Sequence, residues 1–251
     1  MFYKLIYGSD KTNSRIIVLG GETDSGKTYQ SLIYGETDDR MRVLDTENRI
    51  QQTIDFHGID RDIEVVPILQ TYSKTDRSKD QIRFQPDYLS SYDTLRNEIE
   101  KAVDNCNDYD ILVIDGVSPI RNQYCKAKWF RDNTGRKGIM PTEWGDINED
   151  QRQLLESLIH MSRLENKTVI FTAQMTDMYR KDVLVGRQLD MRDWGNYNVD
   201  YIIELYRPTD DNNRPIHNKY MANCTKSIIG AWEEDISNGR NLYDVFLELG
   251  I

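Results

Sequence analysis

Long hydrophobic runs and paired cysteines are both missing from this sequence. No apolar stretch approaches the length of a membrane-spanning helix, and the mean hydropathy is −0.68. The first residues, MFYKLIY, contain neither a charged leader nor a long apolar segment, so we expect no signal peptide. Three cysteines, Cys106, Cys125 and Cys224, stand far apart without a C-x-x-C pair, which argues against a zinc site and a disulfide framework. These absences predict a protein with no membrane partner in a reducing cytoplasm, or in the host cytoplasm if the protein is viral.

The sequence also lacks internal repeats, low-complexity linkers and an excess of positive charge. Its 251 residues suit one α/β domain, so we expect residues 1–251 to form a single domain. The 32 Lys and Arg residues are outnumbered by 42 Asp and Glu residues, and the net charge is −10. This balance argues against a protein that coats nucleic acid over its whole surface, although a local basic patch can still bind phosphates.

What the sequence does contain is a phosphate-binding loop after a short apolar run at residues 16–19. Residues 21–28, GETDSGKT, fit the pattern G-x-x-x-x-G-K-[ST]. The alternative interpretation is a chance match in a glycine-rich turn. Gly21 and Gly26 let the backbone turn so that successive N–H groups converge on a phosphate. In this pattern Lys27 reaches the β- and γ-phosphates of a nucleotide, and the Thr28 hydroxyl ligates Mg²⁺. The predicted nucleotide-contacting residues are Gly21, Glu22, Thr23, Asp24, Ser25, Gly26, Lys27, Thr28 and Tyr29.

Three later apolar runs end in polar residues that suit phosphate chemistry. Residues 41–44 lead to Glu47, residues 109–114 lead to Asp115, and residues 167–173 lead to Gln174. Strands that alternate with helices predict a parallel sheet, whose ligands lie at the carboxyl ends of its strands. Asp115 is predicted to hold Mg²⁺. The amide of Gln174 is predicted to touch the γ-phosphate and to report its loss to the segment that follows.

The residue after Asp115 is Gly116, not a glutamate, so the carboxylate that activates water must come from elsewhere. Glu47, at the end of another strand and therefore beside the phosphate loop, is the available candidate for the catalytic base. The alternative for Glu47 is an ordinary acidic residue at the start of a helix.

Two basic segments follow these strands. Residues 121–138 carry six basic residues and one acidic residue, and they include Lys126, Lys128 and Arg131 together with Tyr124, Trp129 and Phe130. Cations interleaved with aromatic rings suit single-stranded DNA, because cations neutralise phosphates and rings stack on bases. The equally weighted alternative is an ordinary helix with Tyr124 and Trp129 packed inward. Residues 175–194, with Arg180 and Lys181, are either a mobile binding loop or a solvated connection.

The remaining pattern completes an α/β sequence. Residues 1–8 alternate weakly and are a candidate edge strand, and residues 70–85 are expected to form a solvated loop. A capping box at residues 146–149 predicts the start of a helix. The other expected elements are helices at residues 27–34, 88–103 and 242–249, a strand at 63–69, and a late hairpin of strands at 198–206 and 217–224.

With these pieces placed, the sequence resembles the RecA superfamily, and most closely the small single-domain RecA-like ATPases common in phages and archaeal mobile elements. Four motifs carry the resemblance: GETDSGKT at 21–28, VLDTE at 43–47, ILVIDG at 111–116 and VIFTAQ at 169–174. It extends through EWGDIN at 143–148 and covers residues 15 to about 229.

The resemblance implies a mostly parallel sheet flanked by helices, with Glu47 as the base, Asp115 at the magnesium site and Gln174 as the γ-phosphate sensor. It also implies a ring or filament of identical chains, with the two basic segments facing DNA at its centre. In related proteins a basic pair near the last strands reaches the neighbour's nucleotide site. Lys226 fits one member of that pair, and Ile228 stands where the second is expected.

The leading hypothesis is a Mg²⁺-dependent ATPase of RecA-like fold that assembles on single-stranded DNA in recombination or replication. One alternative is a nucleic-acid translocating or packaging motor, against which Gly116 argues. Another is a nucleotide-gated assembly switch that binds a protein and no DNA, which suits the acidic balance.

Overall fold

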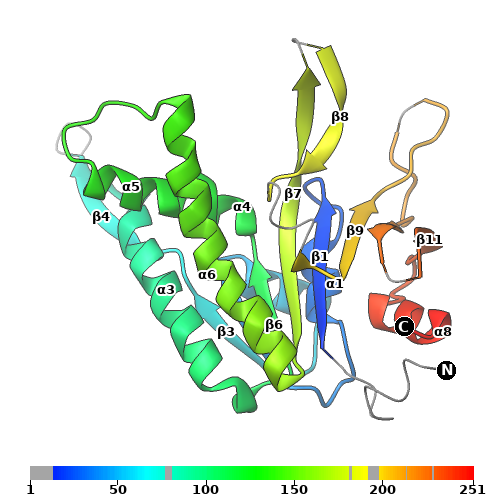
Figure 1. Cartoon of the computed structure of the whole chain (residues 1–251). Coiled ribbons are helices and arrows are strands. Elements are labelled where there is room, and N and C mark those ends of the chain that lie inside the picture. Colours follow the sequence, from blue (N-terminus) through cyan, green and yellow to red (C-terminus); the bar gives the residue numbers. More distant parts are fainter. Residues whose placement is uncertain (1–13, 77–80, 181–182, 192–197, 213, 228) are drawn as a thin grey trace, which may run out of the picture.

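A mostly parallel sheet of nine strands forms the centre of the molecule (Figure 1). The computed structural model describes residues 14–76, 81–180, 183–191, 198–212, 214–227 and 229–251. The strand order is β11-β10-β9-β1-β7-β6-β2-β3, and β8 pairs with β7. The strands of this sheet are β1 (Arg15–Gly21), β2 (Met41–Asp45), β3 (Ile63–Pro67), β6 (Ile111–Asp115), β7 (Thr168–Arg180), β8 (Val183–Leu189), β9 (Tyr201–Tyr206), β10 (Met221–Lys226) and β11 (Trp232–Asp235).

Helices cover both faces of the sheet because its strands are apolar on both sides. In β1, Ile16 and Val18 pack with the helices of one face, whereas Ile17 and Leu19 pack with those of the other. The first face is covered by α3 (Tyr88–Asp104), α5 (Lys126–Asp132) and α6 (Trp144–Glu165), and the second by α1 (Lys27–Leu32), α2 (Ile50–His57) and α8 (Leu242–Leu249). Strands buried on both faces are typical of parallel sheets with helical crossovers.

The register of the sheet gathers the ends of the parallel strands at one edge. Gly21 at the end of β1 lies opposite Gln174 in β7, and Asp45 at the end of β2 lies opposite Asp115 at the end of β6. The phosphate loop, Glu47 and Gln174 therefore emerge at the same edge, as parallel topology requires.

The predicted fold class is confirmed. The central sheet is mostly parallel, helices flank it, and β9 and β10 form the expected late antiparallel hairpin, which β11 extends at the edge. No helix in the described ranges is long and apolar enough to cross a membrane. The candidate edge strand at residues 1–8 lies outside the described residues.

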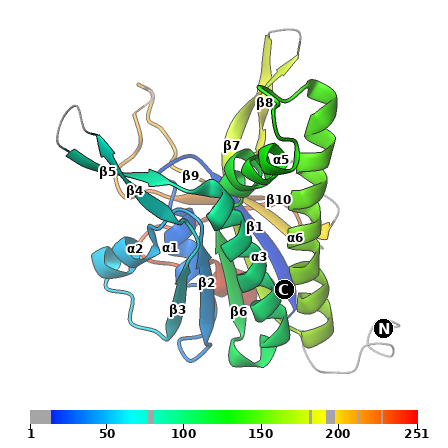
Figure 2. The same ribbon diagram turned by 90° about the vertical axis from the view of Figure 1, so that its left-hand side faces the viewer.

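Three local predictions were wrong. Residues 70–85 are not a loop, because β4 (Thr71–Asp76) and β5 (Gln81–Pro86) pair as a separate antiparallel ribbon that projects from the sheet (Figure 2). Residues 175–194 are not simply a loop either, since β7 runs on to Arg180 and pairs with β8. The helix expected at the 146–149 box begins earlier, at Trp144, and Glu143 bonds back to the Met140 N–H at 2.7 Å.

Candidate nucleotide site

The phosphate loop joins β1 to α1, and its backbone favours glycine at two positions. Gly21 has a φ of +154°, and a Cβ placed there would lie 2.4 Å from the Leu205 carbonyl oxygen of β9. Gly26 has a φ of +90° and directly precedes α1. Glycine at both positions therefore lets the loop turn tightly against the neighbouring strand.

Lys27 folds back over this loop. Its Nζ donates to the carbonyl oxygens of Gly21 at 2.9 Å and Glu22 at 2.6 Å. Burial lowers the pKa of the Lys27 ammonium, and the nearby carboxylates of Asp115 and Glu47 act in the opposite direction. An ammonium placed in this way is available to exchange carbonyl partners for phosphate oxygens.

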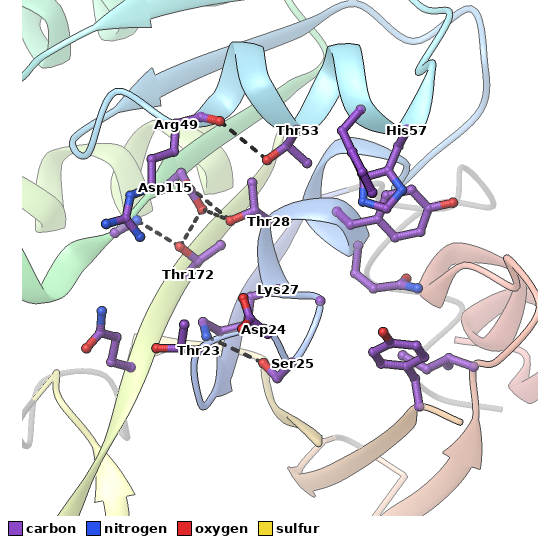
Figure 3. Close-up of a pocket in the computed structure, with 18 of the residues that line it drawn as sticks. Thr23, Asp24, Ser25, Lys27, Thr28, Arg49, Thr53, His57, Asp115 and Thr172 are labelled. Atoms are coloured by element: carbon purple, nitrogen blue, oxygen red, sulfur yellow. Dashed lines mark hydrogen bonds between the residues drawn. The ribbon is translucent and has the colours of Figure 1, made fainter. Parts of the chain in front are cut away.

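Thr28, Asp115 and Thr172 converge beside Lys27 (Figure 3). The Thr28 hydroxyl donates to the Asp115 carboxylate at 3.1 Å, and the Thr172 hydroxyl donates to the same carboxylate at 2.7 Å while accepting from the Gly116 N–H at 2.7 Å. Burial raises the pKa of Asp115 to about 6, and the Thr172 bond acts against this rise.

This donor set fits Mg²⁺. A buried carboxylate beside a threonine hydroxyl offers hard oxygen ligands, and Mg²⁺ in nucleotide sites typically takes one or two carboxylates together with phosphate oxygens and water. The described residues contain no group of three or more His, Cys, Asp or Glu side chains that could hold a metal unaided. Mg²⁺ would therefore bind together with the phosphates, with Thr28 and Asp115 as its protein ligands.

The turn after β2 places Glu47 over the same site. Thr46 donates to the carbonyl oxygens of Asp115 and Gly116, at 2.8 and 2.7 Å, which ties this turn to the end of β6. Gly116 has a φ of +89°, and a Cβ there would lie 2.6 Å from Thr46 Oγ1 and 3.3 Å from Glu47 Cγ. A side chain at position 116 would collide with Thr46 and approach Glu47, whereas Glu47 itself lines the cavity from the turn after β2.

These groups line one cavity of about 630 Å³. Its phosphate end contains Glu47, Asp115 and Gln174, so the structure brings the three predicted strand-end residues together. Of the predicted loop residues, the lining includes Thr23, Asp24, Ser25, Gly26, Lys27, Thr28 and Tyr29, whereas Gly21 and Glu22 lie outside it.

Apart from Tyr29, the sequence-based prediction missed the aromatic part of this cavity's lining. The rings of Tyr29 and His57 approach to 4.4 Å between centroids, and Phe56, Asn218 and Tyr220 also line the cavity. His57 lies away from Asp115 and Thr172 in Figure 3. Thr172 and Arg49 were also missed. Thr172 is two residues before the predicted Gln174, and Arg49 is two residues after the predicted Glu47, a spacing at which two side chains of an extended chain point to the same side. His57 and Tyr220 carry no such local signal.

Two aromatic rings of the basic segment after Asp115 are packed inside the protein, where DNA bases cannot stack on them. Tyr124 and Trp129 are buried in the core, and Tyr124 donates to the Thr46 carbonyl oxygen at 2.6 Å. Lys128 pairs with Asp150 at 2.8 Å, and Arg131 pairs with Asp132 at 3.0 Å. The interpretation of Tyr124 and Trp129 as base-stacking rings is therefore wrong, and the inward-packed alternative holds for both. Lys126 is half-buried on the same helix.

The remaining predicted contact residues lie elsewhere. Arg180 ends β7, and Lys181 lies outside the described residues. Lys226 ends β10 beside Ile202, near the start of β9. Because β10 is antiparallel to β9, Lys226 lies toward the opposite edge of the sheet from the phosphate loop, and it does not line the cavity of its own chain.

A family model described as an AAA domain matches residues 13–214, which is most of the chain. The matched range includes Gly21, Glu47, Asp115 and Gln174. No curated protein matches the chain.

Proposed function

Because the chain belongs to the AAA domain family of P-loop nucleotide-binding proteins, we propose that it is a Mg²⁺-dependent ATPase. The observation that carries this proposal is the single cavity in which the phosphate loop, the Thr28–Asp115 pair and Glu47 meet. The predicted cofactors, ATP and Mg²⁺, match its two kinds of polar group: N–H and ammonium donors for phosphates, and oxygen ligands for the metal.

Each residue has a distinct task in this proposal. Lys27 exchanges the Gly21 and Glu22 carbonyl oxygens for the β- and γ-phosphates, and Gln174 contacts the γ-phosphate from the end of β7. Glu47 orients the attacking water and accepts its proton. When bound, Mg²⁺ supplies positive charge that stabilises the transferred phosphoryl group. The aromatic wall of Tyr29, His57 and Tyr220 is then available to the base of the nucleotide.

Two variants test this chemistry. We expect Lys27→Ala to abolish turnover, whereas Glu47→Gln should keep ATP affinity and lose hydrolysis, because an amide contacts water but cannot accept its proton. ATP hydrolysis and ATP affinity should be measured on the same preparations. Ordinary hydrolysis by the glutamine variant would remove Glu47 from the role of base.

The finer proposal is a RecA-like ATPase that acts on single-stranded DNA in recombination or replication, as a homo-oligomeric ring or filament in the cytoplasm. Its support is the order and spacing of the four motifs, and the position of both basic segments directly after Asp115 and Gln174. Lys126, Lys128, Arg131, Arg180 and Lys181 are its candidate DNA contacts, and Lys226 its candidate contact to a neighbour's nucleotide. We propose that residues 1–251 form one domain, because the central sheet contains both the first and the last described strand, β1 and β11, and α8 packs against it.

One observation favours a second candidate, a nucleotide-gated switch that binds a protein. Lys128 and Arg131 already pair with carboxylates, and the net charge is −10, which leaves less positive charge for phosphates than the sequence suggested.

ATP hydrolysis with and without single-stranded DNA, together with particle size, separates the two candidates. Lys126→Glu is the informative variant, because Lys126 has no ion pair among the described residues, and Arg96→Glu reverses an exposed cation on α3 as its control. The DNA proposal expects stimulation by single strands that Lys126→Glu weakens and Arg96→Glu keeps. Absence of DNA binding and of stimulation would favour the protein switch.

A further inference from the structure

Alternate side chains of the turn after β2 point in opposite directions. Thr46 bonds to the carbonyl oxygens of Asp115 and Gly116, and Asn48 donates to the Leu69 carbonyl oxygen at 2.9 Å. The residues between and after them, Glu47 and Arg49, both line the nucleotide cavity. The turn therefore presents an acid and a guanidinium side by side.

The backbone of this turn is fixed. The buried carboxylate of Asp45 accepts from the N–H groups of Glu47 at 3.1 Å and Ile50 at 2.8 Å, which holds both ends of the turn. Arg49 is the N-cap residue of α2, so its Cα is placed by the first turn of that helix. A functional group on a fixed backbone is held near one working geometry.

The Arg49 side chain, in contrast, can move. It is 68% exposed, and its guanidinium lies 3.5 Å from the Glu47 carboxylate, which is 24% exposed. An ion pair of this length and exposure contributes little to stability, so exchanging it for another anion costs little. In Figure 3, Arg49 lies at the same end of the cavity as Asp115 and Thr172.

The charge of the cavity favours a role for such a cation. Its described lining contains two basic side chains, Lys27 and Arg49, and three carboxyl groups, Asp24, Glu47 and Asp115. A triphosphate carries more negative charge than one Mg²⁺ and one lysine neutralise, and the transition state places charge on the γ-phosphate oxygens. A guanidinium matches two such oxygens through parallel N–H donors, which an ammonium cannot do.

We propose that Arg49 is a catalytic residue of its own chain's site: it leaves Glu47 when ATP binds and donates to the γ-phosphate oxygens in the transition state. This role rests on the proposed ATP hydrolysis. Water forms a bond to the γ-phosphorus, the bond from that phosphorus to the β–γ bridging oxygen breaks, and its electron pair leaves on ADP. The water proton passes to Glu47, whose carboxylate is released for this task by the departure of Arg49.

Arg49→Ala, Arg49→Lys and the exposed control Arg96→Ala test the assignment in the full-length protein. We expect Arg49→Ala to lower kcat about 10²- to 10³-fold, which is the usual loss for one donor to a transition-state oxyanion. Arg49→Lys should recover part of this loss, and Arg96→Ala should hydrolyse like the wild type. ADP affinity should be unchanged in all three, because ADP lacks the γ-phosphate, and this measurement also shows that each variant is folded.

Two further measurements separate a catalytic role from a structural one. ADP with aluminium fluoride mimics the transferring phosphoryl group, and Arg49→Ala should fail to trap it while binding ADP normally. Mixing the Arg49→Ala and Lys27→Ala proteins should restore no activity, since each residue serves its own chain.

The outcomes are distinguishable. A wild-type protein that hydrolyses no ATP overturns the proposed function and this role with it. A wild type that hydrolyses ATP while Arg49→Ala keeps full kcat overturns the role of Arg49 alone. Recovery of activity in the mixture overturns its action within one chain.

Discussion

Replacing Gly116 with alanine measures how tightly the structure holds Glu47 over the phosphate loop. At the Gly116 φ of +89°, an L residue costs about 1–3 kcal/mol of folding free energy. The new Cβ would lie 2.6 Å from Thr46 Oγ1, so this hydroxyl must weaken the hydrogen bond in which its one proton is shared by the Asp115 and Gly116 carbonyl oxygens. With that bond contributing about 1 kcal/mol, we expect a total loss of about 2–4 kcal/mol.

The same substitution should slow hydrolysis. Thr46 precedes Glu47, and the added Cβ would also lie 3.3 Å from Glu47 Cγ, so both neighbours must shift. A shift of this kind at a catalytic group lowers kcat by roughly 10- to 100-fold.

Urea denaturation and steady-state ATP hydrolysis check the two expectations. Gly145→Ala is the matched control, because Gly145 lies in α6 and no atom lies within 4 Å of its added Cβ. Its helix should gain up to about 1 kcal/mol from the alanine. If Gly116→Ala unfolded at the wild-type urea concentration and hydrolysed ATP at the wild-type rate, close packing at position 116 would not be what positions Glu47.

Two other substitutions separate stability from function. Asp115→Asn should stabilise the protein by about 1–3 kcal/mol at pH 7 without Mg²⁺ while abolishing Mg²⁺-dependent hydrolysis, because burial raises the Asp115 pKa to about 6 and disfavours its charge. A folded-state pKa above the unfolded value means that the destabilising contribution of Asp115 becomes smaller as pH falls below about 7. The advantage of Asp115→Asn over the wild type should therefore shrink in denaturation experiments at pH 5, and an advantage that grew would contradict the burial argument. Trp129→Ala should cost about 3–5 kcal/mol, since Trp129 is buried in the core, and wild-type stability combined with lost DNA binding would restore its stacking role.

The motif residues were predictable because each follows a short apolar strand. A parallel sheet brings the ends of such strands to one edge, so the sequence alone predicts that Glu47, Asp115 and Gln174 lie close together. The register bears this out, with Gly21 opposite Gln174 and Asp45 opposite Asp115.

The features that sequence reasoning missed depend on contacts between distant parts of the chain. The β4–β5 ribbon lies apart from the core, so its sequence shows no buried apolar face, and Phe84 is 75% exposed. His57 in α2 and Tyr220 just before β10 line one cavity although they are far apart in the sequence, so no local pattern links them. The aromatic residues at 124 and 129 fit either stacking or core packing by pattern alone, and only burial distinguishes the two.

The two segments that looked independent in the sequence are joined beside the phosphate end of the cavity. The Gln174 N–H donates to Ser118 Oγ at 3.3 Å, and the Gln174 carbonyl oxygen accepts from the Asp190 N–H at 2.8 Å. The Asp190 carboxylate accepts from the Asn122 amide at 2.9 Å, inside a π-helix at residues 120–125, a form often found at functional sites. A displacement of Gln174 must therefore move both the segment after Asp115 and the base of the β7–β8 hairpin. Because these bonds are shared, a nucleotide bound to Gln174 as proposed would act on both segments at once.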